Sequence, residues 1–339
     1  MRSSIPLAAA LAIGALAFAP LAPHAQVPDS KPAADAQRPG APVSEPVKLE
    51  TSSGTVHGTL ERPAASSPVP VVLFIAGSGP TDRNGNSPLI PGANNSLQLL
   101  ADALAANGIA SLRYDKRGIG ESRGVTVSES DIRLETYVDD AAAWVKRLRA
   151  DPRFTTVTIV GHSEGSLIGM LAAERAGADA VVSIAGVGRR ADRVIHDQLA
   201  PRLPPDLMAR SDSILASLVA GKTVDAVPPE LAALYRPSVQ PYFISWLRHD
   251  PAAVAARLAV PLLVAQGTTD IQVPVADAEL LAKAQPRARL LVINGMNHVL
   301  KHVPADPAAQ QKSYGDPSLP VAPELVDGIV EFVKAARKR

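Results

Sequence analysis

The sequence of 339 residues predicts an α/β fold in which helices cover both faces of a mostly parallel central sheet. Two observations carry this prediction. Strand-like apolar runs alternate along the chain with segments of helical spacing. The runs are also continuously apolar, which is typical of parallel strands that are buried on both faces. A hydrophobic content of 46% is enough for a substantial core.

The first 46 residues are predicted to lie outside this fold. Residues 5–19 form an apolar run behind Arg2, and Ala25 offers a cleavage position. The run is short for a membrane span, so residues 1–25 are expected to be a signal peptide. The mature chain would then be periplasmic or secreted, with no stable membrane anchor after cleavage; an uncleaved anchor is the alternative. Residues 26–46, rich in Pro, Ala and polar side chains, predict a flexible linker.

The predicted domain spans residues 47–337 and begins with a hairpin. Residues 47–63 alternate around Gly54, as two strands joined by a tight turn would. Strands and helices then alternate. Strands are predicted at 69–77, 110–115, 157–161 and 179–186, and helices at 95–109, 136–151 and 163–177.

The alternation pauses over residues 188–258, which contain helical and proline-rich pieces without a clear strand. It resumes with strands at 261–267 and 288–294, and with helices near 275–285 and 322–337. A helical insertion of this length between two strands of one sheet predicts a lid.

Composition removes several classes of function. The net charge of +1 gives no indication of nucleic-acid binding. The absence of cysteine excludes disulfides, thiolate metal sites and a cysteine nucleophile. The glycine-rich loop at 76–79 lacks the spacing of phosphate-binding loops. We expect neither a cofactor nor a metal, and nothing in the sequence indicates the oligomeric state.

The segment GHSEG places Ser163 between a predicted strand and a predicted helix. In a Gly-x-Ser-x-Gly turn of this kind the serine adopts a strained backbone and its hydroxyl stands clear of the sheet. Gly161 and Gly165 are needed because a Cβ at either position would meet the neighbouring strand or helix. In this context the motif predicts a nucleophile.

A serine nucleophile requires a base and an acid, which follow it in the order acid, then histidine, in this kind of site. His298 comes directly after the last predicted strand, with His302 as its competitor. Asp270 follows the strand at 261–267 and would orient the imidazole. For the oxyanion, one backbone N–H is expected from Ser78 and one from Glu164, the residue after the nucleophile.

These motifs resemble the α/β-hydrolase superfamily over residues 47–337. The segment RYDKRGIGES at 113–122 is similar to a loop common in that superfamily, where residues matching Asp115 and Arg117 are structural. The segments AGSGPTDRNGN, GHSEGS, QGTTDIQV and GMNH resemble a bacterial branch of esterases, acyl hydrolases and serine-aminopeptidase-like proteins. The resemblance implies a triad of Ser163, Asp270 and His298. One departure is Ala76-Gly77, where many members have His-Gly.

The leading hypothesis is therefore a serine hydrolase that acts on a small-molecule acyl ester. A serine aminopeptidase, with Glu164 available to bind an amine, or an acyl thioesterase would use the same triad. A non-catalytic binding protein on a hydrolase fold is the alternative from another class. Tyr242, Phe243 and Trp246 of the insertion are predicted to line an acyl pocket.

Overall fold

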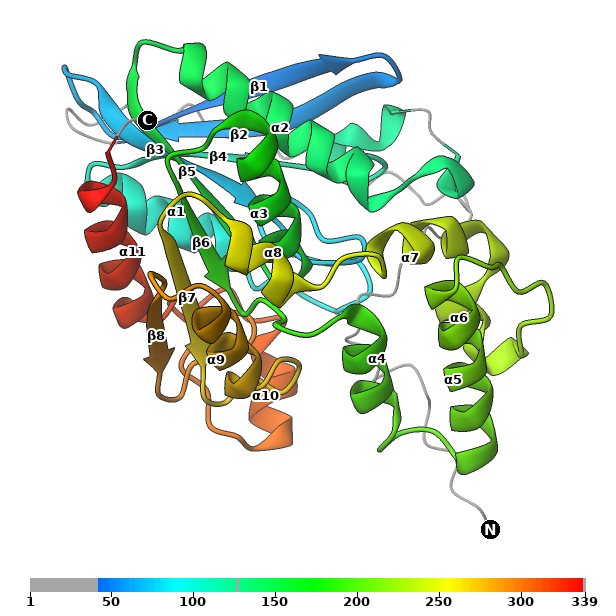
Figure 1. Ribbon diagram of the computed structural model, residues 1–339. Coiled ribbons are helices and arrows are strands. Elements are labelled where there is room, and N and C mark those ends of the chain that lie inside the picture. Colours follow the sequence, from blue (N-terminus) through cyan, green and yellow to red (C-terminus); the bar gives the residue numbers. More distant parts are fainter. Residues whose placement is uncertain (1–41, 126–127, 338–339) are drawn as a thin grey trace.

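The computed structural model describes residues 42–125 and 128–337 (Figure 1). The predicted signal peptide, residues 1–25, and all but the end of the predicted linker lie outside the described residues. Among the described residues, no helix is both long enough and apolar enough to span a bilayer.

One eight-stranded sheet forms the centre of the domain, with the order β1-β2-β4-β3-β5-β6-β7-β8. The β1–β2 and β2–β4 pairs are antiparallel, and every later pair is parallel. The sheet is therefore mostly parallel, as predicted. Its strands are β1 (Val43–Thr51), β2 (Gly54–Arg62), β3 (Val69–Ile75), β4 (Ala110–Tyr114), β5 (Phe154–His162), β6 (Ala180–Ile184), β7 (Leu262–Gly267) and β8 (Arg289–Ile293).

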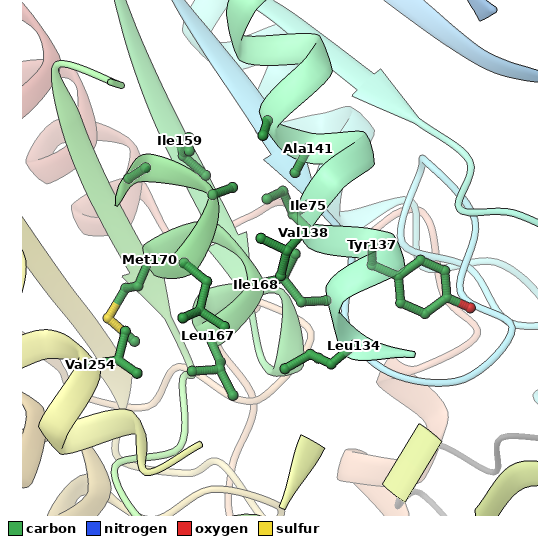
Figure 2. Close-up of a cluster of buried hydrophobic side chains, with 14 of the residues drawn as sticks. Ile75, Leu134, Tyr137, Val138, Ala141, Ile159, Leu167, Ile168, Met170 and Val254 are labelled. Atoms are coloured by element: carbon green, nitrogen blue, oxygen red, sulfur yellow. The ribbon is translucent and has the colours of Figure 1, made fainter. Parts of the chain in front are cut away.

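Helices cover both faces of this sheet (Figure 1). One face carries α1 (Ser96–Ala106) and α11 (Pro323–Ala335), which pack against each other and against the sheet. The other face carries α2 (Leu134–Ala150), α3 (Glu164–Ala176), α8 (Pro251–Arg257) and α9 (Val275–Ala284). Figure 2 shows part of this second core, where Ile75 and Ile159 of the sheet meet Val138 of α2 and Ile168 of α3.

The residues of β3 show why the strand runs are continuously apolar. Leu73 and Ile75 belong to the core beneath α2 and α3, whereas Val72 and Phe74 belong to the core beneath α1 and α11. Successive side chains of a strand point to opposite faces, so both sets are buried.

The segment between β6 and β7 is helical, as predicted. It contains α4 (Ala191–Leu199), α5 (Pro205–Val219), α6 (Ala232–Tyr235), α7 (Gln240–Trp246) and α8, with two short 3₁₀ turns at Pro229–Leu231 and Pro237–Val239. α8 packs on α3 and α9, whereas α4, α5 and α6 stand to one side of the sheet (Figure 1). α7 returns to contact α2.

Two boundaries differ from the sequence prediction. β1 begins at Val43, so the last four residues of the predicted linker, 43–46, are paired with β2. Their proline and serine content hid the strand, yet Pro46 is tolerated because β1 is an edge strand. The short helix α10 (Pro307–Ser313) was not predicted; it begins with Asp306, whose side chain accepts from Ala309 N at 2.9 Å.

Candidate active site

Ser163 lies at the corner between β5 and α3, in a backbone conformation that few residues adopt. Its φ is 54° and its ψ is −121°. A positive φ is strained for a residue with a Cβ and persists only when the surrounding structure enforces it. Ser163 N donates to Ile184 O of β6 at 2.8 Å, which holds the corner against the sheet. The sharp turn presents the side chain at the carboxyl end of β5.

The two flanking glycines make this turn possible. A Cβ added to Gly161 would lie 2.2 Å from Gly165 O, and one added to Gly165 would lie 2.2 Å from Ile75 O. Both distances are impossible for non-bonded atoms, so the collisions expected from the sequence are confirmed. The helix can begin directly above the strand only with glycine at both positions.

His298 and Asp270 form a buried pair on neighbouring loops. His298 Nδ1 lies 2.8 Å from Asp270 Oδ2. The other oxygen, Oδ1, accepts from the backbone N–H of Gln272 at 2.8 Å and of Val273 at 3.0 Å. Burial acts to raise the pKa of Asp270, but His298 and the two N–H donors outweigh it, so the pKa lies below its usual value. The carboxylate is thus kept ionised, and His298 Nδ1 carries the proton.

His162 ties the serine corner to the His298 loop. Its Nε2 lies 2.8 Å from His298 O, and the centroids of the two rings are 4.8 Å apart. Burial, with a smaller contribution from the neighbouring His298 ring, lowers the pKa of His162 to about 3. His162 is therefore neutral at physiological pH, with Nε2–H donating to the carbonyl. Within the described residues no hydrogen bond joins Ser163 to the His298 ring; such bonds are often long before substrate binds.

The loop after β3 lies directly against Ser163. A Cβ on Gly77 would be 3.2 Å from Ser163 Cβ and 3.3 Å from His162 Nδ1. Ser78 and Ser163 line the same pocket. In the described part of the chain, neither Ser78 N–H nor Glu164 N–H donates to a protein acceptor. Both predicted oxyanion donors are therefore without a protein acceptor in the described residues.

The pocket at Ser163 encloses about 450 Å³, including the part that is open to solvent. Its walls come from the loops after β3, β6 and β7 and from the insertion. The lining residues are Ser78, Ser163, Glu164, Val187, Ala191, Val194, Ile195, Gln198, Trp246, Gln272 and Val273. Of the three aromatic residues predicted for the pocket, Trp246 is a lining residue. Tyr242 and Phe243, each 1% exposed, are not: Tyr242 packs against Tyr137 of α2, and Phe243 packs against Tyr235 of α6.

The carboxylate of Glu164 is buried against Tyr242 and Lys116. Glu164 is 3% exposed, and its carboxylate accepts from Tyr242 Oη at 2.8 Å and pairs with Lys116 Nζ at 3.7 Å. The Lys116 ammonium also donates to Gly77 O. Sequence reasoning missed Lys116; the available signal was a lysine just after the strand at 110–115, in a segment that is otherwise structural.

Comparison with known proteins agrees with this fold. The family described as "Serine aminopeptidase, S33" matches residues 93–302. Esterase EstD of Thermotoga maritima is 32% identical over 263 residues; the match covers 76% of this chain and 61% of EstD, so this chain spans less than two thirds of that relative. The chain belongs to the S33 family of the α/β-hydrolase superfamily.

Solved structures place the fold in the same superfamily. Est1E from Butyrivibrio proteoclasticus superposes with a TM-score of 0.55 at 17% identity, covering 86% of this chain and 99% of Est1E. The α/β hydrolase GrgF from Penicillium sp. sh18 gives a TM-score of 0.55 at 19% identity, covering 87% and 99%. At these identities the similarity establishes the α/β-hydrolase fold.

Proposed function

We propose that this protein is a serine hydrolase that cleaves carboxylic esters through an acyl-enzyme on Ser163. One observation carries the proposal. A serine with a strained, positive φ opens onto a pocket lined by Ser78 and Glu164, whose backbone N–H groups have no acceptor among the described residues, next to the loop of a buried His–Asp pair. The relative named Esterase EstD supports the ester substrate.

The proposed mechanism assigns a role to each of these groups. His298 Nε2 takes the proton of Ser163 as Oγ forms a bond to the acyl carbon. The N–H groups of Ser78 and Glu164 stabilise the resulting oxyanion. The bond to the leaving alkoxide breaks, and His298 returns the proton to it. Water then attacks the acyl-enzyme by the same route and releases the acid, with Asp270 holding the imidazole and stabilising its charged form.

The charges around the pocket favour an ester over an aminoacyl substrate. An aminopeptidase must bind the α-ammonium group of its substrate, which requires a carboxylate facing the pocket. Glu164 is the lining residue with a carboxylate, and that carboxylate is already engaged by Lys116 and Tyr242. The family description keeps aminopeptidase as the second candidate, because the match covers most of the domain.

We also propose that residues 188–258 act as a lid that determines which acyl chains are accepted. α4 contributes Ala191, Val194 and Ile195 to the pocket, and α7 contributes Trp246. These side chains are apolar, and the volume of about 450 Å³, part of it open to solvent, lies toward the lower end of the range of about 300–1,000 Å³ for ligand pockets. A short, uncharged acyl group therefore fits the site best.

Export is a separate proposal, which rests on the sequence of residues 1–25. The chain would be cleaved after Ala25 and would function in the periplasm or the medium. N-terminal sequencing of protein from a periplasmic extract should give Gln26 as the first residue. A chain that keeps Met1 in the membrane fraction would contradict export with cleavage.

The test of function uses the chain from Gln26 onward and its Ser163→Ala variant. Hydrolysis is measured for p-nitrophenyl esters of increasing acyl length and for aminoacyl-nitroanilides. The proposal expects turnover of short esters that is lost with Ser163→Ala. Turnover of anilides alone would establish a peptidase, and turnover of acyl thioesters in preference to esters would establish a thioesterase. A protein that does not react with a serine-directed phosphonate would be a binding protein instead.

A further inference from the structure

We propose that Lys116 is a positioning residue for the oxyanion hole, and that the buried carboxylate of Glu164 holds it in place. The inference rests on the proposed function. It starts from the ammonium of Lys116, which lies between the two segments that supply the oxyanion donors. On one side it donates to Gly77 O, and on the other it pairs with Glu164 Oε2 at 3.7 Å.

The contact with Gly77 O acts on the first oxyanion donor through a single peptide group. Gly77 O and Ser78 N–H belong to the same planar amide, and the described chain contains no cis peptide bond. In a trans amide the C=O and the N–H point in opposite directions. A cation on the oxygen therefore fixes the direction of the N–H. It also draws electron density from the nitrogen, which makes the N–H a stronger donor.

The contact with Glu164 involves the second donor. The carboxylate belongs to the residue whose backbone N–H is expected to face the oxyanion. Tyr242 Oη donates to Oε1 at 2.8 Å, whereas Oε2 is buried without a hydrogen bond in the described structure. The positive charge of Lys116, 3.7 Å away, offsets the cost of burying this oxygen without a hydrogen bond. One ion pair thus connects the loop after β3 to the first turn of α3, and both donors are held relative to each other.

Burial lowers the pKa of Lys116 below its ordinary value, and the Glu164 carboxylate opposes that effect and keeps the ammonium in place. Lys116 is 2% exposed, and its ammonium lies 5.4 Å from the centroid of the Tyr137 ring. Figure 2 shows Tyr137 at the edge of the apolar cluster on α2, beyond Val138. Tyr242 packs edge-on against Tyr137, with ring centroids 5.8 Å apart. Burying an ion pair is costly, and a pair that only stabilised the fold could be replaced by apolar side chains. Its place between two oxyanion donors gives it a role in the reaction.

The experiment measures how well Lys116→Met stabilises an oxyanion compared with a neutral carbonyl. The readouts are kcat and KM on p-nitrophenyl butyrate, the inhibition constant of a trifluoromethyl ketone, whose adduct with Ser163 carries an oxyanion, and the inhibition constant of the matching carboxamide. Loss of a whole oxyanion donor lowers kcat by about 100- to 1,000-fold. Because Lys116→Met misaligns a donor rather than deleting it, we expect about a 10- to 100-fold loss in kcat and in ketone affinity. KM and carboxamide affinity should change by less than about threefold.

Two further variants keep the test decisive if Lys116→Met folds poorly. Glu164→Gln retains the backbone N–H and an acceptor for Tyr242 but removes the charge that holds Lys116. It should show a smaller loss of the same kind. In the double variant the two losses should not add, because both act through one contact. Arg117→Met is the matched control. It removes the next cation along the loop, which binds Asp140 at 2.6 Å and does not contact Gly77. It should lower the melting temperature and leave kcat of the folded protein unchanged.

The possible results separate this proposal from the proposed function. If Ser163→Ala is inactive while Lys116→Met matches the wild type in kcat and in ketone affinity, the serine mechanism stands and the role of Lys116 is wrong. Equal losses for the ketone and the carboxamide would show a general collapse of the pocket and would also overturn it. Turnover that survives Ser163→Ala would overturn both proposals.

Discussion

Asp270 and His298 are joined by a 2.8 Å contact between Oδ2 and Nδ1, although they follow different strands of the sheet. The carboxylate is fixed independently, because Oδ1 accepts two backbone N–H groups of its own loop. The imidazole is therefore oriented by a rigid partner, and Nε2 is left to accept a proton.

This relationship predicts that Asp270→Asn will be nearly inactive without losing its fold. The amide has the size of the carboxylate but presents its NH₂ group to His298 and favours the wrong tautomer. In a Ser-His-Asp site this change lowers kcat by about 10⁴-fold. Steady-state kinetics on a short p-nitrophenyl ester would measure the loss, and circular dichroism would confirm the fold.

The matched control is Glu324→Gln. Glu324 pairs with His302 at 2.8 Å on the surface, so the chain contains a second His–acid contact of the same length. Kinetics that respond to Glu324→Gln but not to Asp270→Asn would assign the base to His302, the competitor from the sequence.

Much of this arrangement was predictable from the sequence, because local patterns determine it. The apolar runs gave the strands, and the glycines at 161 and 165 gave the turn at Ser163. The order of the chain then placed Asp270 and His298 after neighbouring strands. The contacts of Lys116 were not predictable. They depend on the distance between the loop after β3 and the start of α3, which only the folded sheet determines. The burial of Tyr242 and Phe243 was not predictable for the same reason. The sequence predicted that both line the pocket, whereas the structure buries them in the core.

Gly165→Ala is predicted to destabilise the domain strongly. The new Cβ would lie 2.2 Å from Ile75 O and 2.9 Å from Ala76 O, so either β3 or α3 must move. Overpacking of this kind costs about 1–3 kcal/mol or more in the free energy of unfolding. Chemical denaturation would measure it. Gly124→Ala is the control, because a Cβ there meets nothing within 4 Å; equal stability of the two variants would contradict the steric explanation.

The lowered pKa of His162 predicts that the folded protein loses stability at acidic pH. The pKa of His162 is about 3 in the folded protein and 6.5 in the unfolded chain. Above pH 6.5 the imidazole is therefore neutral in both the folded and the unfolded protein, and it contributes no pH dependence to stability. Between pH 6.5 and 3 the unfolded chain binds a proton that the folded chain does not, and stability falls as the pH falls. From pH 7 to pH 5 the expected loss is about 2 kcal/mol. Urea denaturation at the two pH values should show a smaller decline for His162→Gln, which keeps a donor near His298 O. An identical decline would mean that other groups cause it.

Trp246 and Phe243 offer a comparison that tests the lid as a determinant of acyl length. Trp246 lines the pocket, whereas Phe243 is buried behind it with ring centroids 5.9 Å apart. Trp246→Ala enlarges the pocket, and each additional buried methylene is worth about 0.8 kcal/mol. Relative to butyrate, kcat/KM for a hexanoyl ester should rise about tenfold. Phe243→Ala should instead cost about 3–5 kcal/mol of stability and leave the acyl preference of the folded protein unchanged. A Trp246→Ala variant with the wild-type acyl profile would place the acyl chain elsewhere, and residues 188–258 would then have no role in selecting it.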